Sequence, residues 1–143
     1  MSFVKRMERV ALAVENLDEA QSFYEQWFGA EVEPEEHIQD MGIRYRPFRV
    51  GESHMELLQA TTDDSPVARF LAANGGPGVH HITFEVDDLD EAVADLEQRG
   101  GRIAYRHEYG PDVTFEGQVW REAFVHPRDA FGVLIHLAET KPA

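Results

Sequence analysis

The chain has 143 residues, carries a formal net charge of −14 at pH 7 and contains no cysteine. The length suits a single domain, and the lack of cysteine excludes disulfides, thiolate metal sites and a thiol nucleophile. The negative charge argues against nucleic-acid binding, which requires a cationic surface. No segment has the apolar length of a signal peptide core or a membrane span, so we expect a cytoplasmic protein that does not contact membranes.

An internal repeat relates the two halves of the chain at an offset of 72 residues, from Val10 to Ile82. Residues 14–20 read Val-Glu-Asn-Leu-Asp-Glu-Ala, and residues 86–92 read Val-Asp-Asp-Leu-Asp-Glu-Ala. The repeat predicts two similar structural modules that present equivalent positions to a shared interface.

The first copy predicts one helix and four strands. Asn16 with Glu19 forms a capping-box pattern, and Gly29 is a typical helix stop, so the helix lies between Asn16 and Gly29. Its aromatic side chains recur at helical spacing, which favours a buried position for Tyr24, Trp27 and Phe28. The strands are expected over about residues 9–14, 30–38, 42–50 and 53–60.

The second copy predicts the same order of elements. Its helix starts after Asp88 and ends at Gly100, again with a glutamate at the third helical position. The strands are expected over about residues 80–86, 102–108, 119–126 and 132–139. Between the copies, Ser65 followed by Pro66 predicts the start of a short helix.

These elements predict an α+β fold in which two β-α-β-β-β modules form a curved mixed sheet around a central cleft. The modules cover about residues 7–60 and 79–139, and a short helical linker over about 61–78 joins them. Together they make one domain over residues 1–143.

Four positions, two in each copy of the repeat, carry polar side chains that are candidates for a functional site. The first strands of the two copies open with Arg9 and His81, and the last strands place Glu56 and His136 between apolar neighbours. A charged or imidazole side chain inside an apolar strand is costly unless it has a partner. We therefore expect these four side chains to converge in one pocket.

Two interpretations of this group stay open. Two imidazoles and one carboxylate suit a divalent metal ion with open positions for water or substrate. Alternatively, Arg9 pairs with Glu56 and the group is a polar network without metal. A second candidate for binding an anionic substrate is the basic segment that contains Arg44, Arg46 and Arg49.

Several motifs resemble the vicinal oxygen chelate superfamily, which contains glyoxalases, bleomycin-resistance proteins and dioxygenases, and within it the methylmalonyl-CoA epimerase family most closely. The motifs are Met55-Glu-Leu-Leu58, Asp64-Ser-Pro66 with Phe70-Leu71, His80-His-Ile82, Val86-Asp-Asp88, and Ala123-Phe-Val-His-Pro127 leading to Gly132-Val-Leu-Ile135. The resemblance covers nearly the whole chain.

The resemblance implies Glu56, His81 and His136 as ligands of one divalent ion, which zinc, cobalt, nickel, iron or manganese would satisfy. Two positions depart from the family, which has histidine where this chain has Arg9 and glutamate where it has His136. The family's catalytic glutamate corresponds to Asp40. Asp40 and His136 are therefore the predicted bases, while Arg9 and Arg44 are predicted to bind substrate or, for Arg9, to replace the metal.

Three functions follow as hypotheses. The first is a metal-dependent epimerase that abstracts a proton next to the carbonyl of an acyl-CoA such as methylmalonyl-CoA, working as a homodimer as the resemblance suggests. The second is a non-haem Fe(II) dioxygenase on the same ligands. The third is a metal-free protein that binds a small molecule, as bleomycin-resistance proteins do.

Overall fold

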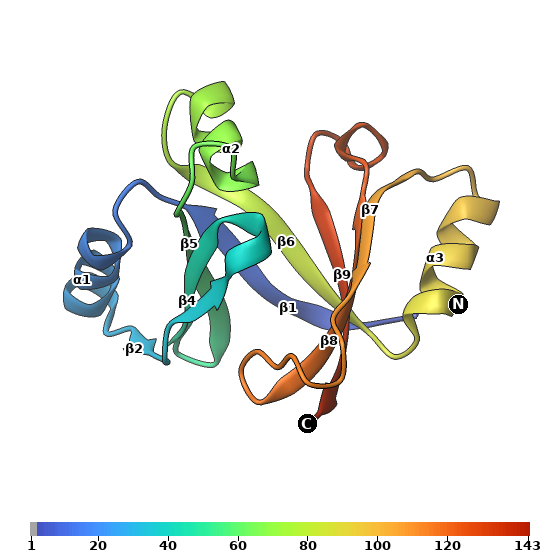
Figure 1. Ribbon diagram of the computed structural model, residues 1–143, viewed down its shortest axis with the longest axis horizontal. Helices are drawn as coiled ribbons and strands as arrows, with labels where there is room; N and C mark the ends of the chain where they lie inside the picture. Colours follow the sequence, from blue (N-terminus) through green and yellow to red (C-terminus); the bar gives the residue numbers. More distant parts are fainter. Residues whose placement is uncertain (1–2) are drawn as a thin grey trace. The chain divides into compact units, whose positions relative to one another are not determined.

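The computed structural model describes residues 3–143, which form three α-helices and nine β-strands (Figure 1). The helices are α1 (Leu17–Phe28), α2 (Pro66–Asn74) and α3 (Leu89–Gln98). The strands are β1 (Val4–Ala13), β2 (Glu31–Val32), β3 (Glu36–Ile38), β4 (Ile43–Val50), β5 (Ser53–Ala60), β6 (Gly78–Val86), β7 (Ile103–Glu108), β8 (Gln118–Val125) and β9 (Ile135–Pro142). Parallel and antiparallel pairs both occur, which confirms the predicted α+β class with a mixed sheet.

The chain divides into two compact units. The first unit is Arg9–His80, and the second unit contains His81–Ala143 together with the described residues up to Glu8. Strand β1 therefore contributes to both units. Its early residues Lys5 and Arg6 form ion pairs with Glu85 of β6 in the second unit.

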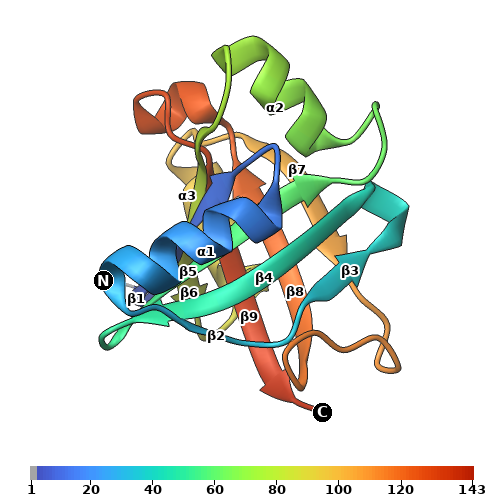
Figure 2. The same cartoon turned by 90° about the vertical axis from the view of Figure 1, so that its left-hand side faces the viewer.

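In the first unit, β5 lies between β1, its parallel neighbour, and β4, its antiparallel neighbour. The short strands β2 and β3 both pair with β4. Helix α1 packs on one face of these strands (Figure 2). The apolar core between helix and strands contains the buried side chains Leu17, Ala30, Phe48 and Leu57.

In the second unit, β9 lies between β6, its parallel neighbour, and β8, its antiparallel neighbour, and β7 pairs with β8. Helix α3 covers one face of these strands (Figure 1). The core under this helix contains the buried side chains Val86, Leu89, Ala92, Val93, Ala123, Val125 and Leu137.

The two units repeat one another in strand register. Val10 of β1 pairs with Met55 of β5, and the equivalent Ile82 of β6 pairs with Ile135 of β9. At the next step, Ala11 pairs with Glu56 in the same way that Thr83 pairs with His136. Glu56 and His136 therefore occupy equivalent places, as the sequence repeat predicts.

The helix starts repeat as well. The side chain of Asn16 accepts a hydrogen bond from the Glu19 amide, as Asp88 does from the Glu91 amide. The Leu17 amide donates to Gln59 Oε1 over 2.7 Å, and the Leu89 amide donates to Glu139 Oε1 over 2.9 Å. The predicted caps are thus confirmed, and each helix is also tied to the last strand of its own unit.

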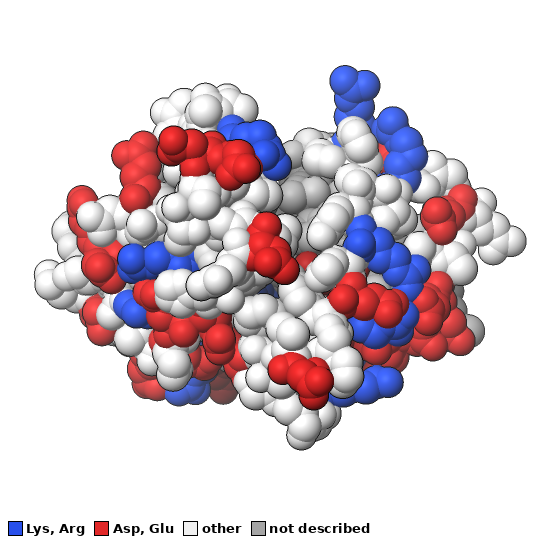
Figure 3. All heavy atoms as spheres, viewed as in Figure 1, with Lys and Arg blue, Asp and Glu red and all other residues white. Residues whose placement is uncertain are grey.

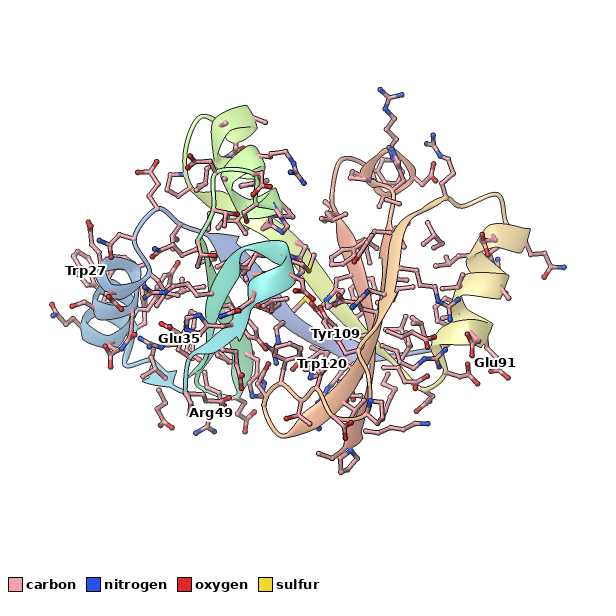
Figure 4. All side chains as sticks on the ribbon, viewed as in Figure 1. Trp27, Glu35, Arg49, Glu91, Tyr109 and Trp120 are labelled. Carbon is pink, nitrogen blue, oxygen red and sulfur yellow. The ribbon has the colours of Figure 1, made fainter. Side chains whose placement is uncertain are left out.

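Two sequence expectations were wrong. The strand expected over residues 30–38 is broken into β2 and β3, because Pro34 has no amide hydrogen to continue a ladder. On α1, Trp27 is 71% exposed and Phe28 is 56% exposed, so they are not core residues. Figure 4 shows Trp27 on the outer side of α1, pointing away from the strands. Leu17, Ala20 and Tyr24 of the same stripe do pack against the core, so the predicted side is right and the error is confined to the end of the helix.

Within residues 3–143, no helix combines the length and the hydropathy that crossing a bilayer would demand.

Candidate active site

The face of the second unit opposite α3 carries a cluster of polar and aromatic side chains. Successive residues of a strand point to opposite faces, and Leu137 of β9 packs into the core under α3. Its neighbour His136 therefore points to the other face. Neighbouring strands add further side chains to that face, and the cluster consists of His81, Thr83, Glu122, Phe124 and His136.

His136 lies at the centre of this cluster, and both of its ring nitrogens have partners. Nδ1 is 2.8 Å from Thr83 Oγ1, and Nε2 is 2.7 Å from Glu122 Oε1. The side chain of His136 is 8% exposed and that of Glu122 is 9% exposed. The imidazole is thus held in one orientation inside the unit.

Glu122 is ionised at neutral pH despite its burial. Burial by itself raises the pKa of the Glu122 carboxyl, but the hydrogen bonds and charges of its neighbours, His136 first, outweigh burial and lower the pKa below the ordinary glutamate value. The second oxygen, Oε2, accepts a hydrogen bond from the Tyr109 hydroxyl over 2.9 Å.

The ionised carboxylate decides the tautomer of His136. A carboxylate can only accept hydrogen bonds, so Nε2 carries a proton that it donates to Glu122. In the neutral ring, Nδ1 then has the lone pair and accepts from the Thr83 hydroxyl. This places the basic nitrogen of His136 at a defined position, which is what a proton acceptor requires.

Aromatic rings surround the network and limit its contact with water. The ring of Phe124 stacks on His136 with 4.6 Å between centroids, and the His81 ring lies 5.1 Å from His136. The ring of His107 meets Tyr109 edge-on at 4.4 Å. Tyr109 and Trp120, both labelled in Figure 4, belong to this part of the second unit. A low-dielectric surrounding strengthens the hydrogen bonds inside it.

In the first unit, Arg9 and Glu56 form a buried ion pair. Arg9 Nη1 lies 3.4 Å from Glu56 Oε1, and the side chains are 5% and 10% exposed. Leu57, next to Glu56, packs into the core under α1, so Glu56 points to the face without the helix. The structure therefore brings together two of the four predicted residues in each unit, and the convergence of all four stays a prediction.

Arg44 lies on the other face of the first unit. Its Nη2 is 3.1 Å from Glu35 Oε1 and 3.4 Å from Asp18 Oδ1 of α1, and Arg46 also contacts Glu35 at 3.1 Å. Arg49 pairs with Glu31. On the face shown in Figure 3, too, Lys and Arg side chains lie beside Asp and Glu side chains in both units. The basic segment is thus compensated by carboxylates of its own unit.

Asp40 is exposed and lies in the 3-10 turn Gln39–Met41 before β4. The turn ends at Gly42, whose φ of 64° places it in the left-handed region that favours glycine. A Cβ at this position would collide with Thr62 Oγ1. Gly42 therefore sets the direction in which the backbone continues from the turn with Asp40 into β4.

The contacts of the predicted ligands do not fit a divalent ion. A guanidinium stays protonated and cannot ligate a metal, yet Arg9 is the ion-pair partner of Glu56. Nε2 of His136 bonds to Glu122, and a metal at Nδ1 would have to displace the Thr83 hydroxyl. Across residues 3–143, no three His, Asp or Glu side chains are arranged to hold a metal.

Sequence reasoning did not predict the network that Thr83, Glu122 and Tyr109 form around His136. The signal for Glu122 was present, because it shares one face of its strand with Trp120 and Phe124, two residues away on either side. Arg121 points to the α3 side, where it pairs with Glu139 and Asp90.

Comparison with known proteins identifies the family to which this fold belongs. Residues 6–137 match the model of the glyoxalase/bleomycin resistance protein/dioxygenase superfamily. Mitochondrial methylmalonyl-CoA epimerase of Bos taurus is 35% identical over 138 residues, which cover 94% of this chain and 74% of that protein.

Solved structures of epimerases have the same fold. The crystal structure of methylmalonyl-CoA epimerase from Mycobacterium tuberculosis aligns with a TM-score of 0.84 and 33% identity, over 100% of this chain and 91% of that one. A methylmalonyl-CoA epimerase in complex with methylmalonyl-CoA and NH4+ aligns with a TM-score of 0.82 and 31% identity, over 95% and 94%. The chain belongs to the glyoxalase/bleomycin resistance protein/dioxygenase superfamily.

Proposed function

We propose that this chain is an acyl-CoA epimerase that inverts the carbon next to the thioester carbonyl, with methylmalonyl-CoA as its first candidate substrate. The observation that carries the proposal is the oriented imidazole of His136, held between Thr83 and Glu122. The similarity to methylmalonyl-CoA epimerases over nearly the whole chain supports the same reaction.

The reaction needs a proton acceptor and a proton donor. The bond between the α-carbon and its hydrogen breaks, the proton moves to a base, and the electron pair moves into the carbonyl to form an enolate. A proton then returns to the opposite side of the carbon, which restores the carbonyl with inverted configuration. No atom is gained or lost, so the reaction consumes no co-substrate.

We assign one proton-transfer role to His136 and the other to Asp40. Nδ1 of His136 becomes the acceptor when the Thr83 hydroxyl turns away from it, while Glu122 keeps the proton on Nε2. Asp40 provides a carboxylate at an exposed turn whose geometry Gly42 sets. Charge develops on the enolate oxygen, and a positive group nearby would stabilise it.

The test is exchange of the α-hydrogen with solvent. Purified protein is mixed with methylmalonyl-CoA in deuterated water, and deuterium incorporation is followed by mass spectrometry with and without added divalent metals. We expect incorporation with the wild type and a loss of about 100-fold or more for His136→Gln, since a positioned acid–base group is typically worth that much. Absence of exchange under every metal condition would overturn the assignment.

A metal-free binding protein is the second candidate, and the buried Arg9–Glu56 pair favours it. Such a protein would bind an acyl-CoA in calorimetry without exchanging its α-hydrogen. A dioxygenase would consume oxygen with a catechol after loading with Fe(II).

The homodimer and the cytoplasmic location remain predictions. Light scattering of the purified protein tests whether it is a homodimer.

A further inference from the structure

We infer that Arg9 takes the place of a divalent ion, so that the reaction proposed above runs without metal. The inference rests on the proposed function for its catalytic part and on the Arg9–Glu56 contact for its binding part.

The contact itself disfavours a metal at Glu56. A divalent ion on Glu56 would compete with Arg9 for the same carboxylate, because Arg9 Nη1 lies 3.4 Å from Glu56 Oε1. The guanidinium and a metal ion would also repel one another, because two cations a few ångströms apart interact strongly where water is excluded. Arg9 and Glu56 are both buried, at 4% and 7% exposure.

The repeat shows how the two units differ at equivalent positions. Arg9 and Glu56 in the first unit correspond to His81 and His136 in the second, because the parallel strand pairs keep the same register. Two imidazoles provide nitrogen lone pairs that suit a metal. A guanidinium beside a carboxylate provides a fixed positive charge and no lone pair on the cation.

The charge of Arg9 is suited to the electrostatic part of the reaction. A guanidinium has five N–H donors and stays charged at every pH at which enzymes work. A fixed donor aimed at a developing oxyanion lowers the barrier without the loss of metal ions to chelators. We therefore expect exchange activity that chelators leave unchanged.

The experiment measures metal binding separately from catalysis. Protein without a polyhistidine tag is treated with EDTA, exchanged into chelator-free buffer and dialysed against Zn²⁺ or Co²⁺, and bound metal is determined by mass spectrometry. We expect less than about 0.1 equivalent on the wild type and clearly more on Arg9→His, which removes the guanidinium and adds an imidazole beside Glu56. Arg49→His is the matched control, because it places an imidazole beside one exposed carboxylate, that of Glu31, and it should bind no more than the wild type.

A second experiment tests whether the positive charge at position 9 is needed for exchange of the α-hydrogen. Arg9→Lys should keep a larger share of the exchange rate than Arg9→Met, and circular dichroism together with thermal unfolding shows whether each variant is folded. If Arg9→Met fails to fold, the double variant Arg9→Met/Glu56→Leu replaces the pair by apolar side chains and provides the uncharged comparison.

The outcomes separate this inference from the proposed function. About one equivalent of metal on the wild type that is lost in Glu56→Gln would overturn the inference, even if the protein is an active epimerase. Equal rates for Arg9→Lys and folded Arg9→Met would overturn its catalytic part. A wild type that binds no metal and exchanges no α-hydrogen would overturn the proposed function and leave the binding part in place.

Discussion

The imidazole of His136 donates its Nε2 proton to the buried carboxylate of Glu122 across 2.7 Å. The two residues come from neighbouring antiparallel strands, β9 and β8. This bond, together with the Thr83 hydroxyl on Nδ1, makes His136 a group of defined tautomer and orientation.

The first prediction concerns Glu122. Glu122→Gln removes the negative charge that selects the Nε2–H tautomer, and we expect the exchange rate to fall by at least about 10-fold, because a wrongly protonated imidazole is a poor base. Heteronuclear NMR of the histidine side chains should show the Nε2–H tautomer of His136 in the wild type and a changed pattern in the variant. Glu91→Gln on the exposed side of α3 is the control and should alter neither readout. An unchanged rate and tautomer in Glu122→Gln would contradict the assignment.

The second prediction concerns Tyr109. Tyr109→Phe deletes the hydroxyl that donates to Glu122 Oε2, and we expect the free energy of unfolding to fall by about 1 to 3 kcal/mol, the cost of leaving a buried acceptor with a missing donor. Urea denaturation measures the change. Tyr105→Phe, at a tyrosine that is 43% exposed, should change stability much less. Equal effects of the two substitutions would show that the Tyr109 bond is not specific.

The third prediction is a pH dependence of stability. Burial by itself raises the pKa of the Glu122 carboxyl. The hydrogen bonds and charges of His136 and its other neighbours outweigh burial, so the pKa in the folded protein lies below the ordinary value of 4.5. The stabilisation is therefore fully present above pH 4.5 and is lost as the pH falls below that value toward the folded pKa. Denaturation between pH 3 and pH 7 should show stability falling more steeply in the wild type than in Glu122→Gln. Parallel curves for the two proteins would refute the contribution of this group.

The fourth prediction separates two glycines with positive φ. Gly42 has a φ of +64°, and a Cβ there would collide with Thr62, whereas Gly51 has a φ of +60° and open space around it. Gly51→Ala should cost about 1 kcal/mol through backbone strain, and Gly42→Ala should cost clearly more. Thermal unfolding measures both, and Thr62→Ala should recover part of the loss in Gly42→Ala. Failure of that rescue would show that the collision is relieved elsewhere.

The fifth prediction concerns the aromatic side chains of the first unit. Trp27 is 71% exposed and Phe48 is 0% exposed. Trp27→Ser should change the free energy of unfolding by less than about 0.5 kcal/mol, while Phe48→Ala should cost about 3 to 5 kcal/mol through the cavity it leaves. A large loss for Trp27→Ser would mean that this side chain is covered in solution, which light scattering of the variant would then address.

The local patterns were sufficient for the three helices and for most of the strands. Asn16 and Asp88 cap their helices as the capping boxes predict, and Ser65 with Pro66 starts α2. These features depend on neighbours within a few residues, which a sequence displays directly. The same locality explains the error at Trp27, since spacing identified the side of α1 that packs on the core but not how far along the helix the core extends.

For the candidate site, the sequence predicted the polar positions inside apolar strands but not the residues that they contact. Glu56 and His136 stood out because period-two alternation isolates them among apolar residues. The carboxylate that binds His136 is 14 residues away, on a strand whose register with β9 no local pattern specifies. Its identity therefore needed the paired strands.

The sequence by itself determined that two copies of one unit exist, that each ends in a strand with a polar residue at its centre, and that arginine stands at position 9 where the second copy has His81. Only the tertiary structure decided that Arg9 neutralises Glu56, that Glu122 and Thr83 hold His136, and that Arg44 faces α1. The physical reason is that hydrogen bonds and ion pairs act over a few ångströms. Strand pairing sets those short distances between residues that lie far apart along the chain.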